Sequence, residues 1–93
     1  MIYAYVHLDI TNPDSLAQYR ERAGAALEKH GGAVAGAAPG PTVLEGSLAA
    51  PSMAAVLTFP DRDAALAWIG DPDLAEVHAL RRGAGSSSIV LIG

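Results

Sequence analysis

The chain has 93 residues, the size of one domain, and 51% of them are hydrophobic although only 5% are aromatic. Its formal net charge is −4, with 6 Lys and Arg against 10 Asp and Glu, so it lacks the basic surface that neutralises phosphates, and nucleic acid is not an expected partner. Cysteine is absent, which excludes disulfides, thiolate catalysis and sulfur-ligated metals.

The chain opens without a charged segment and cleavage site, and no apolar run reaches the roughly 20 residues that span a bilayer. We therefore expect one soluble, cytoplasmic domain over residues 1–93 that makes no membrane contact. A domain this small buries only roughly 60–65% of its unfolded surface, so dimerisation would help to stabilise it.

Residues 2–10 alternate with period two, which predicts a β-strand with two different faces. One face is apolar. The other carries aromatic and polar groups where a solvent-exposed face usually has Lys, Glu or Thr. This indicates a face that is covered by another part of the protein or by a partner but that still contacts polar groups or water. A strand covered on both sides belongs in the middle of a sheet. The second face consists of Tyr3, Tyr5, His7 and Asp9.

Asn12 starts a predicted helix, because it can cap the first turn, Pro13 suits the first helical position and Asp14 complements the positive helix end. The helix should end at Gly31-Gly32. Its inward stripe consists of Leu16, Tyr19, Ala23, Ala26, Leu27 and His30.

Two short pieces, Ala33–Ala35 and Thr42–Glu45, are predicted as an edge strand that the Gly- and Pro-rich residues 36–41 interrupt. The compact apolar run Met53–Phe59 lies between two prolines and predicts a buried strand.

Asp61 caps a second predicted helical region, which Gly70-Asp71-Pro72 interrupts, and Ser88–Ile92 is the expected last strand. A last short helix lies between these two segments. In the first helical part Ala64, Ala65, Trp68 and Ile69 share one broad face, and in the last short helix Leu74, Val77, His78 and Arg81 lie on neighbouring turns.

The predicted order is therefore β-α-β-β-α-β, an α+β ferredoxin-like fold with a four-stranded antiparallel sheet, helices on one face, and the first and third strands in the centre. The two helical regions cover only one face of such a sheet. The other face needs a cover, and a second copy of the same sheet is the simplest one. We therefore expect a homodimer with facing sheets.

An ordered set of short motifs along nearly the whole chain resembles the bacterial family called domain of unknown function 1330 (DUF1330), within the dimeric α/β-barrel superfamily. Two positions differ: Leu74 stands where the family commonly has an aromatic residue, and serines stand where an asparagine often precedes the last strand. These changes suggest a pocket shaped for a different ligand. The motifs are the tyrosine-containing first strand, Asn12-Pro13 with Tyr19, His30-Gly31-Gly32, Val43-Leu44-Glu45-Gly46, Leu57-Thr58-Phe59-Pro60, Ala67-Trp68, Asp71-Pro72 and Ala79-Leu80-Arg81.

The resemblance implies the fold and the dimeric α/β barrel, but no agreed reaction. Relatives in the wider superfamily include cofactor-free monooxygenases, polyketide cyclases and lactone isomerases. The resemblance therefore implies a class of chemistry, carried out on a small molecule without a cofactor.

His30 and His7 are the candidate bases. His30 ends the helical stripe and can titrate near neutral pH, although a histidine there can also cap the helix carbonyls. His7 shares a strand face with Tyr5 and Asp9, where it can act as a base or be satisfied by a partner subunit.

Tyr19 is a candidate donor to a developing enolate oxygen, or a packing residue between helix and sheet. Glu45 and Arg81 can each anchor a carboxylate or enol, although a solvated ion pair is the commoner outcome. Tyr5 is a second candidate donor, and Trp68 is expected to form core or the wall of a cavity.

His78 is expected at the surface. The three histidines lack the local spacing of a metal motif, and no glycine-rich segment has a nucleotide-binding context, so we expect neither a metal nor a cofactor.

Two functions stay open. The first is a small cofactor-independent enzyme that promotes cyclisation or isomerisation of an apolar, enolisable, polyketide-like molecule by proton transfer and substrate folding, with a cofactor-free monooxygenase as a variant. The second is a homodimer that binds a small molecule without converting it, or that has only a structural role. A structural module would have no cavity, or one well below the ~300 Å³ typical of ligand sites.

Overall fold

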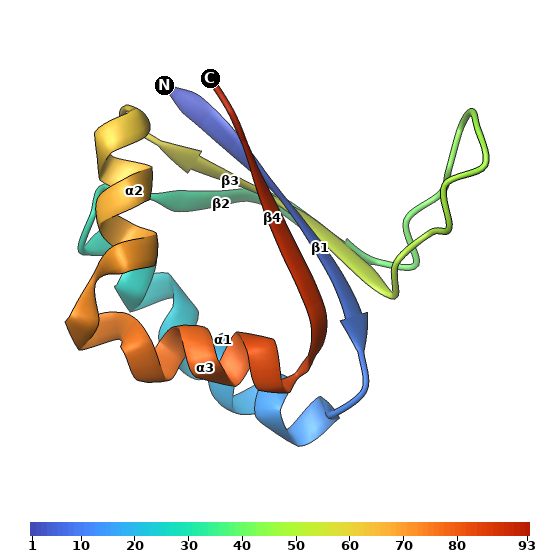
Figure 1. Ribbon diagram of the computed structural model, residues 1–93, viewed down its shortest axis with the longest axis horizontal. Helices are drawn as coiled ribbons and strands as arrows, with labels where there is room; N and C mark the ends of the chain where they lie inside the picture. Colours follow the sequence, from blue (N-terminus) through green and yellow to red (C-terminus); the bar gives the residue numbers. More distant parts are fainter.

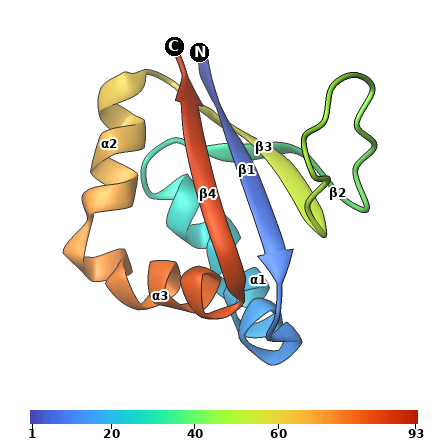
Figure 2. The same cartoon turned by 45° about the vertical axis from the view of Figure 1, so that its right-hand side comes forward.

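β1 (Ile2–Ile10) lies in the middle of a four-stranded antiparallel sheet in the computed structural model, which describes residues 1–93 (Figure 1). The strand order is β2-β3-β1-β4, with β2 at Ala33–Pro39, β3 at Met53–Phe59 and β4 at Gly85–Ile92. This confirms the predicted ferredoxin-like order with β1 and β3 in the centre. The two chain ends lie side by side, because Tyr3 pairs with Ile92 (Figure 2).

Three α-helices pack on one face of the sheet, and the first two begin where the sequence predicts. The Asn12 side chain caps α1 (Pro13–Glu28) by accepting from the Ser15 N–H at 3.2 Å. The Asp61 side chain caps α2 (Arg62–Gly70) by accepting from the Ala64 N–H at 2.8 Å. The interruption after α2 is a 3₁₀ turn, η1 (Pro72–Leu74), which leads into α3 (Ala75–Gly83).

The core lies between the sheet and the helices. The even residues of β1 point to the helices, as their apolar character predicts, and Leu8 and Phe59 are each only 1% exposed. The principal core cluster consists of Ala4, Val6, Ala26, Leu27, Ala55, Leu57, Phe59, Ala65, Trp68, Leu74 and Val77.

The edge strand differs from the prediction. β2 does not stop at Ala35: it continues through the Gly- and Pro-containing residues to Pro39, with a register shift between Val34 and Gly36 that keeps it paired to β3. An edge strand accepts proline because one of its sides needs no N–H donor. Thr42–Glu45 is not a strand and lies in an exposed loop, residues 40–52, which projects beyond the sheet in Figure 1.

The last strand begins earlier than predicted, at Gly85 instead of Ser88. Gly85 makes this possible, because a Cβ there would come within 1.7 Å of the Asp9 carbonyl oxygen and its φ is +158°. Serines then occupy the start of an edge strand whose other side is open to water. None of the helices combines the length and apolar character that crossing a bilayer requires.

Candidate functional site

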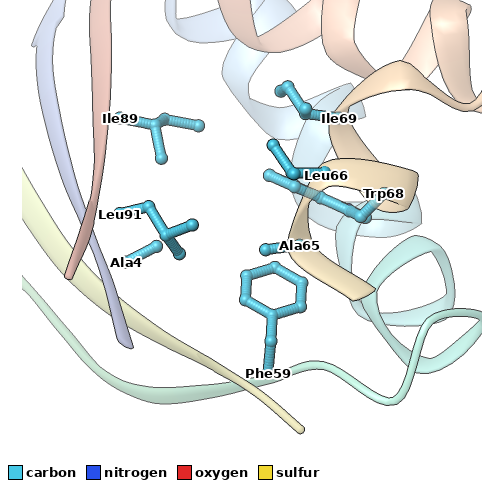
Figure 3. Close-up of a pocket in the computed structure, with 8 residues that line it drawn as sticks. All are labelled: Ala4, Phe59, Ala65, Leu66, Trp68, Ile69, Ile89 and Leu91. Carbon is cyan, nitrogen blue, oxygen red and sulfur yellow. The ribbon is translucent and has the colours of Figure 1, made fainter. Parts of the chain in front are cut away.

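An apolar cavity of about 190 Å³ lies between α2 and the sheet (Figure 3). In Figure 3 the side chains of α2 stand on one side of the cavity, opposite those of β1 and β4. Leu66 and Ile69 are 49% and 37% exposed, so they form a rim open to solvent. All the lining residues are hydrophobic: Ala4, Phe59, Ala65, Leu66, Trp68, Ile69, Ile89 and Leu91.

Trp68 connects this cavity to a buried polar cluster. Its indole lies 5.4 Å from the Phe59 ring, centroid to centroid, and meets the His78 imidazole edge-on at 4.7 Å. The Arg81 guanidinium lies 5.3 Å from the centre of the same indole. Trp68 is thus buried in the core and also forms part of the cavity wall, the two positions expected for it.

Arg81 and His78 are 3% and 2% exposed and bind each other within α3. His78 Nε2 lies 2.9 Å from the Trp68 carbonyl oxygen, to which it donates, so Nδ1 is free to accept from Arg81 Nη1 at 2.8 Å. Burial lowers the pKa of His78, and the charge of Arg81 adds to the effect, which together favour this neutral form. Both imidazole nitrogens are therefore occupied, and His78 fixes Arg81 and Trp68 in place.

The Arg81 guanidinium has no carboxylate within ion-pair distance. It is held between two aromatic rings, with Tyr19 at 5.6 Å and Trp68 at 5.3 Å from the guanidinium carbon. The buried Nε of Arg81 and Nε1 of Trp68 have no hydrogen-bond partner. Three residues singled out from the sequence, Tyr19, Trp68 and Arg81, are therefore neighbours.

Two expectations are wrong in this cluster. His78 is not a surface residue, and Arg81 is not part of a solvated ion pair. Burial of both residues could have been predicted from helical spacing, because they share one side of η1 and α3 with two apolar residues. The four buried residues are Leu74, Val77, His78 and Arg81. A polar residue on such a stripe is buried when a neighbour on the next turn can satisfy it.

His30 lies in a second polar cluster, at the junction of α2 and η1. Its Nε2 is 2.8 Å from Asp71 Oδ2, and the two side chains are only 17% and 9% exposed. Lys29 donates to the same oxygen at 2.7 Å. Hydrogen bonds from Lys29, from His30 and from the Asp73 N–H hold the pKa of Asp71 well below its usual range, and the bond to Asp71 raises the pKa of Lys29.

The His30–Asp71 pair is an imidazole oriented by a carboxylate. An imidazole that donates Nε2–H to a carboxylate keeps its lone pair on Nδ1, the form of a general base. The pair does not line the cavity, but it adjoins two residues of the cavity wall. Gly32, two residues after His30, packs so tightly on Phe59 that a Cβ there would lie 2.9 Å from the ring. The Asp71 N–H donates to the Trp68 carbonyl oxygen at 3.4 Å.

The remaining predicted residues lie elsewhere. His7 and Tyr5 are neighbours on the opposite face of the sheet, with ring centroids 6.3 Å apart and planes at 69°. Glu45 is exposed in the loop of residues 40–52 and forms no ion pair. The three residues expected to be catalytic, His30, His7 and Tyr19, are thus divided among three places. No group of three or more His, Cys, Asp or Glu side chains is arranged to hold a metal ion.

Comparisons with known proteins identify a family and a fold. The family model described as "Domain of unknown function (DUF1330)" matches residues 1–93. The crystal structure of the RPA0582 protein from Rhodopseudomonas palustris, a protein of unknown function, superposes with a TM-score of 0.73 at 20% identity over 98% of this chain and 79% of that one. The methylated RPA0582 protein gives 0.76 at 20% identity over 98% and 78%. No curated protein matches the chain.

Proposed function

This chain belongs to the DUF1330 family, and we propose that it binds a small, largely apolar molecule in the cavity between α2 and the sheet and moves a proton on it without a cofactor. The cavity carries the proposal. At about 190 Å³ it is below the ~300 Å³ of sites for drug-sized ligands, a size that by the criterion above favours a purely structural module, but it is larger than an apolar cavity of roughly 150 Å³ that takes up benzene. The ligand is therefore the size of one substituted ring.

The proton chemistry rests on His30. Its bond to Asp71 orients the ring and selects the lone pair on Nδ1, which suits abstraction of a proton next to a carbonyl. The substrate class is an apolar molecule with an enolisable carbonyl, and the reaction class is isomerisation or cyclisation through the enol. Arg81, which is buried without an acidic partner, lies behind the Trp68 indole and adds positive potential at that wall of the cavity.

A non-catalytic binding protein is the second candidate. The specific observation that favours it is the uniformly hydrophobic cavity lining, with neither His30 nor Tyr19 among the lining residues. Such a protein would hold the same ligand and leave it unchanged.

Deuterium exchange separates these two functions. Phenylacetone, a one-ring ketone, is incubated with the protein in D₂O, and NMR follows both its binding and the loss of its α-protons. If the protein is an enzyme, the α-protons should exchange faster than in buffer alone. His30→Gln should abolish this exchange, and His7→Gln should leave it intact because His7 lies on the other face of the sheet. Binding without exchange supports the second candidate, and the absence of binding refutes both.

A homodimer is also part of the proposal. Its support is the sheet face that no helix covers, on which Tyr3, Val56, Val90 and Ile92 are 45%, 38%, 56% and 60% exposed. Sedimentation equilibrium should give twice the 9.5 kDa mass of the chain. A species of single chain mass at micromolar concentration would refute the dimer.

A further inference from the structure

The helices leave the edge strand β2 uncovered on their own side of the sheet. The register places Val34 of β2 opposite Leu57 of β3 and Ala37 opposite Ala55, and both of these β3 residues belong to the core under the helices. Residues directly opposite each other point to the same face of a sheet, so Val34 and Ala37 face the helical side as well. Val34 is nevertheless 52% exposed, and so is every other residue of β2 classed as exposed. The layer of helices is therefore incomplete over this strand.

A mostly apolar groove of about 370 Å³ lies in this gap, between α1 and the edge of the sheet. It shares no lining residue with the cavity under α2, so it is a separate site. It lies on the helical side of the sheet, and the proposed dimer, which uses the other face, leaves it open. Its walls come from α1, β2 and β3 and include Ala23, Gly24, Val34, Ala37 and Met53.

Gly24 keeps the groove open on the side of α1. It lies inside the helix, where glycine is less favourable than alanine. A Cβ at position 24 would meet nothing within 4 Å, and its φ is not positive, so neither crowding nor backbone conformation requires glycine there. The missing side chain instead extends the groove to the helix backbone, which lets a ligand approach closely.

Arg20 places one unpaired positive charge in the groove. It lines the groove at the end where Pro39 pairs with Met53, and its guanidinium forms no ion pair. Its one side-chain hydrogen bond runs from Nη2 to Met53 Sδ at 3.6 Å, and a thioether is only a weak acceptor. A guanidinium matches the geometry of a carboxylate, so the groove is complementary in charge to an anion with an apolar body.

We infer that this groove binds an amphipathic monocarboxylate, an unbranched apolar chain that ends in a carboxylate. The carboxylate pairs with Arg20, and the chain runs along β2 towards Val34, past the opening at Gly24. The lining residues of β2, from Val34 to Pro39, span roughly 16 Å of extended strand, which suits a chain better than a single ring.

The size of the groove favours a small molecule over a protein partner. Its volume of about 370 Å³ falls within the roughly 300–1,000 Å³ of small-molecule sites. A stable protein interface takes roughly 20–30 residues on each side, whereas 9 residues line this groove.

Methionine methyl NMR tests the site directly, because the chain has only 2 methionines. Met53 lines the groove, and Met1, which is 80% exposed at the start of the chain, is the internal control. Octanoate is titrated into protein that carries ¹³C at the methionine methyl groups. We expect the Met53 signal to shift saturably and the Met1 signal to stay in place. A Met53 signal that does not move at millimolar octanoate would overturn the inference.

The neutral analogue 1-octanol tests the role of charge. The unmodified protein should bind octanoate roughly 10-fold or more tightly than 1-octanol, because only octanoate gains a charge-assisted hydrogen bond. Arg20→Gln, a substitution at an exposed position, should remove this preference and leave the fold intact. Equal Kd values for the two compounds in the unmodified protein, or a preference that survives Arg20→Gln, would show that the groove does not recognise a carboxylate.

Gly24→Leu tests the location. The leucine should fill the groove and weaken octanoate binding roughly 10-fold or more, while the far-UV circular dichroism stays unchanged because the added atoms meet nothing in the chain. Ala25→Leu is the matched control, since Ala25 is exposed on the same helix outside the groove and its substitution should leave the Kd unchanged. An octanoate Kd that ignores Gly24→Leu would place the ligand elsewhere and refute the site.

This inference stands apart from the proposed function. Ala65→Leu fills the cavity under α2 and should leave octanoate binding unchanged, because Ala65 does not line the groove. A failure of phenylacetone to bind therefore leaves the groove standing, and a failure of octanoate to bind leaves the cavity standing.

Discussion

Filling the cavity with Ala65→Leu should stabilise the protein and abolish ligand binding. Ala65 lies on α2, is 6% exposed and lines the cavity, so leucine adds three carbon atoms to unoccupied space (Figure 3). Burial of three carbons contributes about 2.4 kcal/mol at ~0.8 kcal/mol each. Ordering the leucine side chain costs about 0.5–1 kcal/mol. We expect the free energy of unfolding to rise by about 1.5 kcal/mol.

Urea unfolding followed by far-UV circular dichroism measures this change, at one fixed protein concentration because a dimer couples stability to concentration. Ala67→Leu is the matched control, since Ala67 is exposed on the same helix and should change the free energy by no more than about 0.5 kcal/mol. Phenylacetone should bind Ala67→Leu and not Ala65→Leu. A destabilisation of Ala65→Leu by more than about 1 kcal/mol would show an already filled site and refute the cavity.

Three further predictions concern the polar clusters. His78→Phe should lower the free energy of unfolding by about 2–3 kcal/mol in urea unfolding, because it leaves the buried Arg81 donor without an acceptor, and a change below about 0.5 kcal/mol would contradict that role. The lowered pKa of His78 means that the unfolded chain binds a proton more readily than the native one, so stability should fall as pH drops from 7 towards 5, and His78→Gln should flatten that slope. The pKa of Asp71 is lowered by hydrogen bonds to its carboxylate, whereas the pKa of His78 is lowered by burial. The stability that Asp71 contributes is present above the ordinary carboxyl pKa of 3.8 and is lost as the pH falls below that value. Asp71→Asn should therefore reduce stability at pH 6 and lose less stability than the unmodified protein between pH 4 and 2, and equal losses would contradict the ion-pair cluster.

The sequence predicts the fold because local signals and patterning agree along most of the chain. The alternation in residues 2–10 identifies the central strand, and Asn12 and Asp61 mark helix starts that the structure confirms. These features depend on neighbours in sequence, which periodicity and capping report directly.

The misses occur where pairing partners decide the outcome. Gly36 and Pro39 are poor strand residues, but hydrogen bonding to β3 keeps them extended. Gly85 allows β4 to begin three residues early because β1 approaches too closely for any side chain. Neither contact can be read from the composition of the segment itself.

The site is predicted only in part for the same reason. The sequence singles out Tyr19, Trp68 and Arg81 as candidates, and the structure brings them together, with Arg81 buried and not in the expected solvated ion pair. His78 was missed because its partners, the Trp68 carbonyl and Arg81, become visible only when α2 and α3 are placed. The His30–Asp71 contact spans 41 residues and has no sequence signature.

A crystal structure of the protein soaked with phenylacetone tests the proposed binding most directly. We predict density for the ring between Trp68 on α2 and Leu91 on β4, with the carbonyl towards the end of the cavity nearest Asp71. A cavity that stays empty at saturating phenylacetone, or that closes because Leu66 and Ile69 fill it, would contradict the proposed function.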